Sequence, residues 1–221
     1  MRAAPATERD LLDRARQLSG LTLGELAQRL GRAVPADPRR SKGLAGEMLE
    51  AALGATAGSA PEPDFPDLGV ELKTIPVDRS GRPTESTWVC VAPLTVEPGM
   101  TWENSLVRRK LARVLWVPVA GDKAIPLGNR RIGSAVFWSP DPAQAGQLRT
   151  DWEEIMEYVA LGRIGAITAR HGTVLQVRPK AATGRARVRG TDDQGGSSAT
   201  LPRGFYLRAR FTAAILRAAY A

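Results

Sequence analysis

The stretch DFPDLGVELKT, residues 64–74, places charged side chains in and beside a segment that otherwise has the composition of a buried strand. Side chains alternate between the two faces of a strand, so Val70 and Leu72 share one face while Glu71 and Lys73 share the other. Ionised groups in a protein interior cost several kcal/mol each unless they are paired or bind a metal. The stretch therefore indicates either a solvated edge strand or a site in which these charges have a chemical role.

Asp64, in the loop before this strand, can be delivered to the charged face. Two carboxylates can hold a divalent cation through oxygen ligands, and Mg²⁺ keeps most of its waters in such a site, with the backbone carbonyl of Leu72 as a candidate third ligand. A cation held in this way makes water more acidic, and Lys73 would orient the attacking water. The pattern favours metal-assisted hydrolysis of a phosphodiester. The alternative is a surface salt bridge between Glu71 and Lys73 on an edge strand.

The bulk composition is that of a globular protein. The chain has 221 residues, of which 43% are hydrophobic and 24% charged, which is ordinary for such proteins and enough to bury a core. No apolar run approaches the ~20 residues that span a bilayer, and MRAAPATERD at the N-terminus has no signal-peptide pattern. The single cysteine, Cys90, excludes an intrachain disulfide and is interpreted as a core thiol. We expect a cytoplasmic protein with no membrane partner.

Positive charge is concentrated in the last quarter of the sequence. The net charge is +8, and residues 170–221 hold ten basic and two acidic residues, whereas residues 1–169 hold 21 of each. Such segregation favours a surface that binds a polyanion, because neutralising phosphates releases condensed counterions. The alternative is a basic surface that serves only solubility.

Local patterns predict a mixture of helices and strands. We expect helices after the caps Thr7 and Thr22 (the latter in a capping box with Glu25), at about 43–53, from a cap at Thr150, and at 211–220. Strands are predicted at about 69–75, 87–93, 113–119, 134–138 and 173–179, and a mobile basic loop at 183–200. Since helices and strands do not alternate strictly, the fold class is α/β of the mixed α+β kind.

Several longer runs resemble the MutH family of methyl-directed mismatch-repair endonucleases. They are RRSKGLAGEMLEAALGATAGSAPEPDFPDLGVELKTIPVD, GRPTESTWVCVAPLT, TWENSLVRRKLARVLWVPV, ITARHGTVLQVRPKAA and LPRGFYLRARFTAAIL. Together they cover nearly the whole chain in order. The family is similar to type II restriction endonucleases, so the resemblance implies a mixed sheet flanked by helices. It also implies a single domain over residues 1–221, with two sub-lobes around a DNA cleft.

The resemblance assigns the catalytic residues. It implies that Asp64 and Glu71 are Mg²⁺ ligands, that Lys73 lies beside the attacking water, that Glu50 is a further active-site carboxylate, and that Lys110 is another active-site lysine. Helical periodicity alone places Glu50 on a solvated face, away from the apolar stripe. Read alone, Lys110 is one of three cations on a solvated face. The implied cofactor is Mg²⁺, as one or two ions, with Mn²⁺ or Ca²⁺ as substitutes for binding.

The resemblance also assigns DNA-binding residues for duplex GATC sites. It places Lys42 near the active site and the DNA backbone, Arg178, Pro179 and Lys180 in the major-groove loop, and Tyr206 near the adenine whose methylation is sensed. Lys and Arg pair well with guanine O6 and N7, and adenine N6 is exposed in the same groove. The alternative for Tyr206 is a half-buried packing residue. Trp88 has no assigned role, and His171 is interpreted as a structural turn residue.

Three functions compete. The leading hypothesis is a monomeric nicking endonuclease that cuts 5′ of the G on the unmethylated strand of GATC, activated by MutL after MutS detects a mismatch. The second is a GATC restriction enzyme of the Sau3AI type, which makes double-strand breaks; those enzymes carry two MutH-like copies in a much longer chain. The third is a catalytically silent DNA-binding module, which leaves the charges of residues 64–73 without a role.

Overall fold

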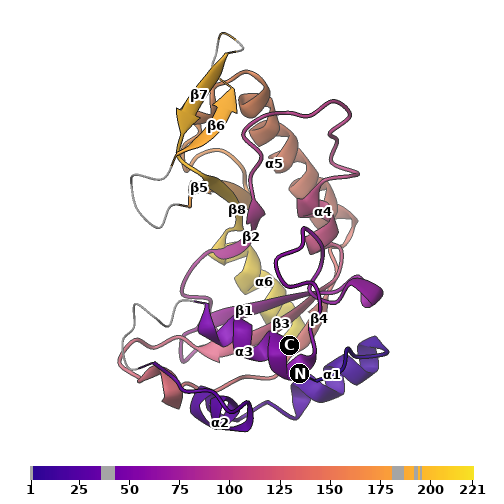
Figure 1. Cartoon of the computed structure of the whole chain (residues 1–221), viewed down its shortest axis with the longest axis vertical. Helices are drawn as coiled ribbons and strands as arrows, with labels where there is room; N and C mark the ends of the chain where they lie inside the picture. The colour runs from indigo at the N-terminus through magenta and orange to yellow at the C-terminus, as the bar shows by residue number, and fades with distance from the viewer. Residues whose placement is uncertain (1, 36–42, 181–186, 192–193, 195) are drawn as a thin grey trace. The chain divides into compact units, whose positions relative to one another are not determined.

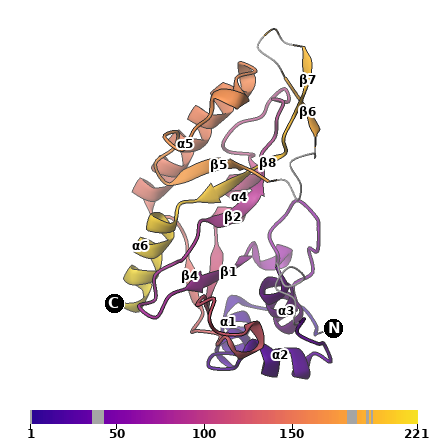
Figure 2. The ribbon, with the colours of Figure 1, turned by 90° about the vertical axis from the view of Figure 1, so that its left-hand side faces the viewer.

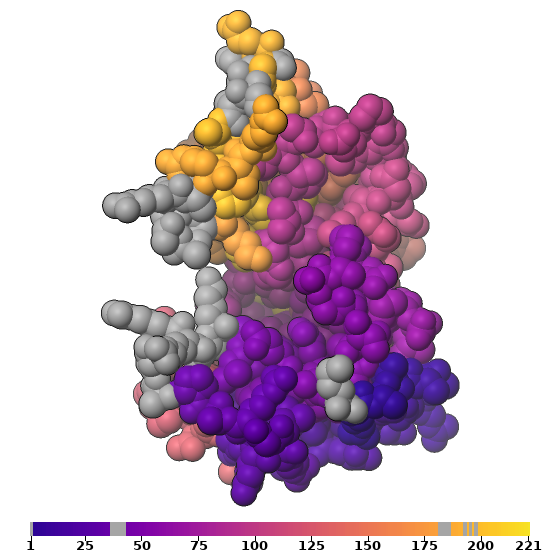
Figure 3. Space-filling model, viewed as in Figure 1, coloured from indigo at the N-terminus to yellow at the C-terminus, as the bar shows by residue number. Residues whose placement is uncertain are grey.

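The computed structural model describes residues 2–35, 43–180, 187–191, 194 and 196–221; the remaining residues are drawn in grey in Figures 1 and 3. The chain divides into two compact units, each described here by itself. Unit 1 comprises Met1–Glu85, Arg109–Ser139 and Ala213–Ala221, and unit 2 comprises Ser86–Arg108 and Pro140–Thr212. Two helices, α4 (Leu106–Leu111) and α6 (Ala209–Tyr220), contain residues of both units.

Unit 1 combines a small mixed sheet with helices. The strands are β1 (Glu71–Val77), β3 (Val114–Ala120) and β4 (Val136–Trp138), and the helices are α1 (Glu8–Arg16), α2 (Leu23–Arg29) and α3 (Leu44–Leu53). The sheet order is β1-β3-β4, with β1 parallel to β3 and β3 antiparallel to β4. Buried apolar side chains of all three helices join those of β1 and β3 in one core. Short 3₁₀ turns, η2 (Pro66–Leu68) and η3 (Leu127–Asn129), complete this unit.

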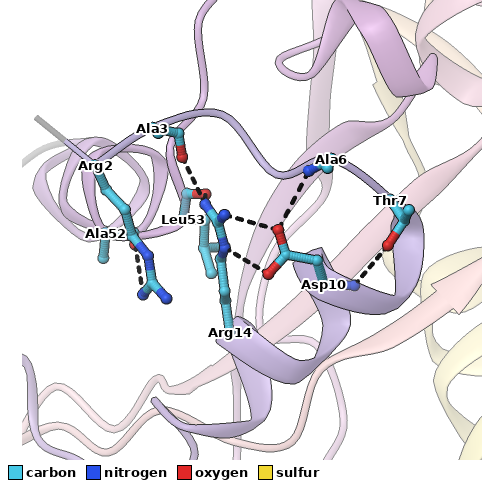
Figure 4. Close-up of polar contacts among 8 residues, drawn as sticks. All are labelled: Arg2, Ala3, Ala6, Thr7, Asp10, Arg14, Ala52 and Leu53. Atoms are coloured by element: carbon cyan, nitrogen blue, oxygen red, sulfur yellow. Dashed lines mark hydrogen bonds and ion pairs between the residues drawn. The ribbon is translucent and has the colours of Figure 1, made fainter.

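The start of the chain is tied to the end of α3 (Figure 4). Thr7 caps α1, accepting a hydrogen bond from the Asp10 backbone N–H at 3.1 Å, and Asp10 in turn holds the guanidinium of Arg14. Arg14 donates to the carbonyls of Ala3 and Leu53, at 2.6 and 3.2 Å. The last carbonyls of a helix need such external donors. Arg14 therefore fixes the C-terminal end of α3, the helix that carries Glu50.

Unit 2 is built on a second three-stranded sheet. The strands β2 (Thr87–Val91), β5 (Leu175–Pro179) and β8 (Arg203–Leu207) run antiparallel in the order β2-β8-β5. Helix α5 (Pro142–Ala160) packs against β5 (Figure 2). A separate hairpin is formed by β6 (Val188–Thr191) and β7 (Ser197–Thr200), and a short turn, η4 (Ile164–Ala166), follows α5.

The two faces of this sheet differ in chemistry. One face is apolar, with buried side chains from β5 and β8: Leu175, Val177, Phe205 and Leu207. The alternating positions point the other way, and the register pairs Tyr206 with both Gln176 and Trp88, and Gly204 with Arg178. We call the face that carries Trp88, Gln176, Arg178, Gly204 and Tyr206 the Tyr206 face. It presents aromatic and cationic groups together.

Many of the sequence predictions are confirmed. The mixed α+β class is correct, and each predicted strand overlaps an observed strand. The Thr7 cap and the capping box of Thr22 and Glu25 are both present. The β1 strand lies at the sheet edge, but its charged pair is buried, so the alternative of a surface salt bridge is wrong. No described helix is long and apolar enough to cross a membrane. The cleft between sub-lobes stays a prediction.

Two local predictions are wrong, and strand β8 was missed. The helix predicted from Thr150 begins at Pro142, with Asp141 as its N-cap, and Thr150 lies inside it, donating its hydroxyl proton to the Gly146 carbonyl at 3.1 Å. The segment predicted as a mobile loop at 183–200 contains the β6–β7 hairpin. The strand β8 was not predicted, because RGFYL is short and begins with an arginine and a glycine, which are poor signals for a strand.

Candidate active site and DNA-reading face

A buried carboxylate lies between two lysines at the start of β1. Glu71 is 1% exposed, and its backbone N–H is fixed by the Arg113 carbonyl at 2.9 Å. The Nζ of Lys110, from α4, donates to Oε2 and Oε1 of Glu71 at 2.8 and 3.0 Å. The Nζ of Lys73 also donates to Oε1 of Glu71. A carboxylate in the interior is stable only when it is paired and hydrogen-bonded, and here both oxygens of Glu71 accept from lysine ammonium groups. The side chains of Glu71 and Lys73, predicted to share one face of the strand, are therefore in direct contact.

Asp64 is held against the backbone of the same strand. Its Oδ2 accepts a hydrogen bond from the Leu72 N–H at 2.8 Å, and its own carbonyl accepts from the Thr56 N–H at 3.0 Å. Burial raises the pKa of the Asp64 carboxyl above its ordinary value. Repulsion from Glu71 adds to this rise, while Lys73 opposes it. A carboxyl whose pKa is raised by burial and by a neighbouring carboxylate is typical of a site for a cation or for acid–base chemistry.

Glu50 joins this cluster from α3. Periodicity placed Glu50 on a solvated face, which is wrong, because the residue is half-buried. Burial raises the pKa of its carboxyl, and repulsion from Asp64 adds to this rise. Attraction to Lys73 lowers the pKa and so opposes both. A Cβ built on Gly46 would lie 3.9 Å from both Glu50 Oε1 and the Thr74 hydroxyl, so these oxygens border the same small space. Within the described residues, that buried hydroxyl has no hydrogen-bond partner.

The structure thus brings together all five predicted catalytic residues, namely Glu50, Asp64, Glu71, Lys73 and Lys110, within unit 1. The predicted DNA contact Lys42 lies outside the described residues. No three His, Cys, Asp or Glu side chains in the described part of the chain gather closely enough to hold a metal ion by themselves. A cation here would have to be held by one or two carboxylates, with water or substrate completing its shell, as is usual for Mg²⁺.

The predicted DNA-reading residues lie in unit 2, on and beside the Tyr206 face. The Tyr206 ring meets Trp88 edge-on, with centroids 5.2 Å apart. The guanidinium carbon of Arg178 lies 5.8 Å from the Tyr206 centroid, and the ammonium of Lys180 lies 3.2 Å from the Trp88 centroid. Both cations are within the range of a cation–π contact. Arg178, Pro179 and Lys180 are exposed, whereas the two rings are partly buried.

Gly204 is a residue that the sequence predictions missed. A Cβ at this position would lie 1.8 Å from Cζ3 of Trp88, so only glycine lets the indole cross β8 at this point. An isolated glycine inside a strand often marks the close approach of another group, but this signal could not be used because β8 itself was not predicted. Trp88, which sequence reasoning left unassigned, thereby becomes the packing partner that orients Tyr206.

Two other residues behave as expected. His171 lies in a turn, where its Nδ1 accepts a hydrogen bond from the Thr168 backbone N–H at 2.9 Å and its ring packs edge-on against Tyr158. Cys90 is buried, at 4% exposure. Both residues are therefore structural in this fold.

Comparison with known proteins finds relatives along the whole chain. The family described as DNA mismatch repair enzyme MutH matches residues 53–151. The DNA mismatch repair protein MutH of Vibrio cholerae serotype O1 (strain M66-2) is 54% identical over 221 residues, which is the full length of both chains. Proteins of the same name from Shewanella amazonensis and Salmonella paratyphi B are 56% and 59% identical; the alignments cover 98% and 96% of this chain and 96% and 92% of theirs.

These relatives cover the segments that carry the buried acidic cluster and the Tyr206 face, so the family resemblance seen in the sequence is confirmed. Identity above half over the full length leaves one assignment: the chain belongs to the MutH family of DNA mismatch repair enzymes.

Proposed function

We propose that this mismatch-repair endonuclease uses Mg²⁺ to nick the unmethylated strand of GATC sites, 5′ of the G, in hemimethylated or unmethylated DNA. The observation that carries the proposal is the buried Glu71 carboxylate, held by Lys73 and Lys110 beside Asp64. A mere structural salt bridge would need one lysine and no neighbouring acid. Two lysines and two additional carboxylates at one strand end suit phosphodiester hydrolysis.

The residues present fit a hard divalent cation. Carboxylate oxygens of Asp64 and Glu71 are the donors that Mg²⁺ prefers, and it commonly takes only one or two protein carboxylates together with substrate phosphate oxygens. Burial raises the pKa of Asp64 and of Glu50, with repulsion from Glu71 adding to the rise for Asp64 and repulsion from Asp64 adding to it for Glu50, and a bound cation would offset that repulsion. The unpartnered Thr74 hydroxyl gives this space a further polar wall. One or two ions are compatible with this donor set, and Mn²⁺ or Ca²⁺, which prefer similar ligands, would bind in their place.

The protein's own groups have distinct tasks in this proposal. When bound, the cation supplies Lewis-acid polarisation of the phosphodiester. Lys73, with its Nζ at Glu71 Oε1, orients the attacking water and keeps an ammonium where negative charge develops. Lys110, bonded to both oxygens of Glu71, fixes the orientation of that carboxylate. Glu50, whose carboxyl is repelled by Asp64 and attracted by Lys73, adds a further acidic group to the site.

Sequence reading is proposed for the Tyr206 face and the strand end beside it. Arg178 and Lys180 would donate to guanine O6 and N7 in the major groove, with Pro179 shaping the loop between them. The N6 methyl of a methylated adenine adds bulk and removes one N–H donor. Since Trp88 and Arg178 both pack against the Tyr206 ring, the ring cannot easily move aside for that methyl group. Discrimination then follows from fit rather than from a new charge.

The proposed partners follow from the role in repair. We propose that the chain acts as a monomer, since one active site cuts one strand, and that MutL activates it after MutS detects a mismatch. The net charge of +8 suits the approach to duplex DNA.

A strand-specific cleavage assay tests the proposal. Closed circular plasmid with a single GATC is incubated with the protein and Mg²⁺ in its unmethylated, hemimethylated and fully methylated forms. The expected result is a nicked circle from the first two forms, with the nick on the unmethylated strand, and no cutting of the third. Equal cutting of all three forms would contradict methylation sensing. Linear plasmid as the first product would favour the Sau3AI-type alternative instead.

Calorimetry separates the enzyme from a silent DNA-binding module. Titration of Mg²⁺ or Ca²⁺ into the protein should show heat of binding that is lost in Asp64→Asn. Asp67→Asn is the matched control, because it makes the same change in the neighbouring 3₁₀ turn η2. Identical isotherms for the wild type and both variants would mean that the acidic cluster binds no cation.

A further inference from the structure

Unit 2 has an open pocket that has been given no role so far, although Arg178 is one of the residues that line it. Its volume is about 630 Å³, and it lies where the turn before β5 meets the end of β8. Its lining includes four arginines, Arg170, Arg178, Arg208 and Arg210, together with the polar side chains of Ser86, Thr173 and Gln176. None of the described residues that line it is acidic. The pocket is therefore strongly electropositive.

The wall of the pocket is built from one turn that is fixed on both sides. On the α5 side, Asp151 accepts hydrogen bonds from the N–H groups of residues 173–175, and Glu154 accepts from the Gly172 N–H at 2.9 Å. On the pocket side, Arg208 donates to the carbonyls of residues 169, 171 and 172, at 2.7 to 3.1 Å. Gly172 has φ +70, and a Cβ there would lie 1.9 Å from the Leu175 carbonyl oxygen. The wall is thus preorganised.

The charges of the four arginines are not neutralised by this network. Arg208 and Arg210 bind carbonyl oxygens, the latter that of Thr173 at 2.7 Å, and Arg178 lies over an aromatic ring. Across the described residues, none of the four guanidinium groups forms an ion pair with a carboxylate. The two nearby acids, Asp151 and Glu154, are occupied by backbone N–H groups. A group of arginines that, in the described part of the chain, has no carboxylate partner favours the binding of an external anion.

The pocket is continuous with the Tyr206 face. Gln176 and Arg178 alternate with the buried Leu175 and Val177, so they share the side of the sheet that carries Tyr206. The side chain of Gln176 is held by the Ser86 hydroxyl at 2.9 Å. A duplex whose bases meet the Tyr206 face would carry its sugar–phosphate backbone across the neighbouring surface. Tetrahedral phosphate oxygens match the forked donors of arginine.

We propose that this pocket is a backbone subsite, in which Arg170 and Arg210 each contact one phosphate of the DNA backbone beside the GATC sequence, while Arg208 positions the turn that holds Arg170. The inference rests on the proposed function for its substrate class, duplex DNA. A contact of this type fixes the register of the protein on DNA but carries no sequence information. The subsite therefore contributes affinity, and the neighbouring Arg178 contributes specificity.

Salt-dependent binding tests this division of labour. Affinities for a GATC duplex and for a duplex of scrambled sequence are measured by fluorescence anisotropy between about 50 and 200 mM salt, without Mg²⁺. Each phosphate contact contributes about 0.9 to the slope of log K against log salt. Arg170→Ala and Arg210→Ala should each reduce the slope by about that amount, with an unchanged ratio of the two affinities.

The matched control is Arg163→Ala, which removes one charge from an exposed position of unit 2 that does not line the pocket. Its slope should stay at the wild-type value. If the slopes of Arg170→Ala and Arg210→Ala equal that of Arg163→Ala, the subsite does not exist. If either substitution lowers the ratio of the affinity for the GATC duplex to that for the scrambled duplex, the pocket reads sequence instead. Failure of the proposed function would appear separately, as a wild-type protein without preference for GATC, because the slope comparison uses either duplex.

Discussion

Replacing Asp151 by asparagine tests how α5 fixes β5, the strand that ends in Arg178 and Pro179. Asp151 is 2% exposed, and its oxygens accept hydrogen bonds from the backbone N–H groups of residues 173–175 at 2.8, 2.6 and 2.8 Å. Gln147 donates a fourth, at 3.0 Å. An asparagine has the same shape but only one acceptor oxygen, so at least one N–H of the turn would face an amide NH₂ group.

The cost follows from these contacts. A hydrogen bond to a charged acceptor contributes about 1.5–3 kcal/mol, and a buried donor without a partner costs about 1–3 kcal/mol. Asp151→Asn removes one such bond, and the remaining bonds then have a neutral acceptor in place of a charged one. The free energy of unfolding of unit 2 should therefore fall by about 3 kcal/mol. For a urea dependence of about 2 kcal/mol per M, the unfolding midpoint should fall by about 1.5 M.

Urea unfolding followed by tryptophan fluorescence measures this change, because one of the tryptophans lies beside the substituted residue. Trp152 is the next residue of α5, is 5% exposed and packs against Trp102, with ring centroids 6.0 Å apart. The control is Glu153→Gln, the same chemical change at an exposed position of the same helix, where an effect within about 0.5 kcal/mol is expected. Equal midpoints for Asp151→Asn and Glu153→Gln would show that the buried carboxylate of Asp151 does not stabilise the turn before β5.

Three further predictions use other parts of the chain. Gly204→Ala puts a Cβ 1.8 Å from the Trp88 ring and should lower the free energy of unfolding by about 1–3 kcal/mol. The control Gly165→Ala, with open space around it, should not. Equal thermal midpoints for the two variants would argue against close packing of Trp88 on Gly204. Asp141→Ala removes the N-cap of α5 and should cost about 1 kcal/mol in urea unfolding; no change would mean that the helix begins elsewhere. Lys110→Met should slow nicking by about 10²-fold or more in single-turnover assays while leaving DNA affinity unchanged; wild-type cutting would remove Lys110 from the catalytic set.

Local signals in the sequence predicted local structure well. Thr7, Thr22 and Glu25 have side chains that satisfy helix N–H groups within three residues, so their caps can be recognised without any tertiary information. The same kind of signal also misled: Thr150 and Glu153 have capping-box spacing, yet the stronger signal was Asp141, followed by a proline at the first helical position. Competing caps in one segment can be ranked only when the packing of the helix is known.

The candidate site depended on contacts that no local pattern contains. Strand alternation correctly placed Glu71 and Lys73 on one face, but Lys110 comes 39 residues later and reaches Glu71 from another element. Glu50 looked solvated on a helical wheel because the wheel separates polar from apolar residues and does not distinguish water from a buried charged cluster. These residues were found through resemblance to a family, whereas Gly204 and the Arg170 pocket were visible only in the fold.

The most direct test of the account is the effect of Lys73→Ala on nicking and on DNA binding, measured on the same hemimethylated GATC duplex with Mg²⁺ and with Ca²⁺, respectively. Lys73 is 8% exposed as a residue and its ammonium is bonded to Glu71, so it acts where charge develops and not on the DNA surface. If Lys73 acts only in cleavage, nicking should fall by about 10²-fold or more while the dissociation constant for the DNA duplex stays close to that of the wild type. Nicking by Lys73→Ala at the wild-type rate would contradict this role of Lys73.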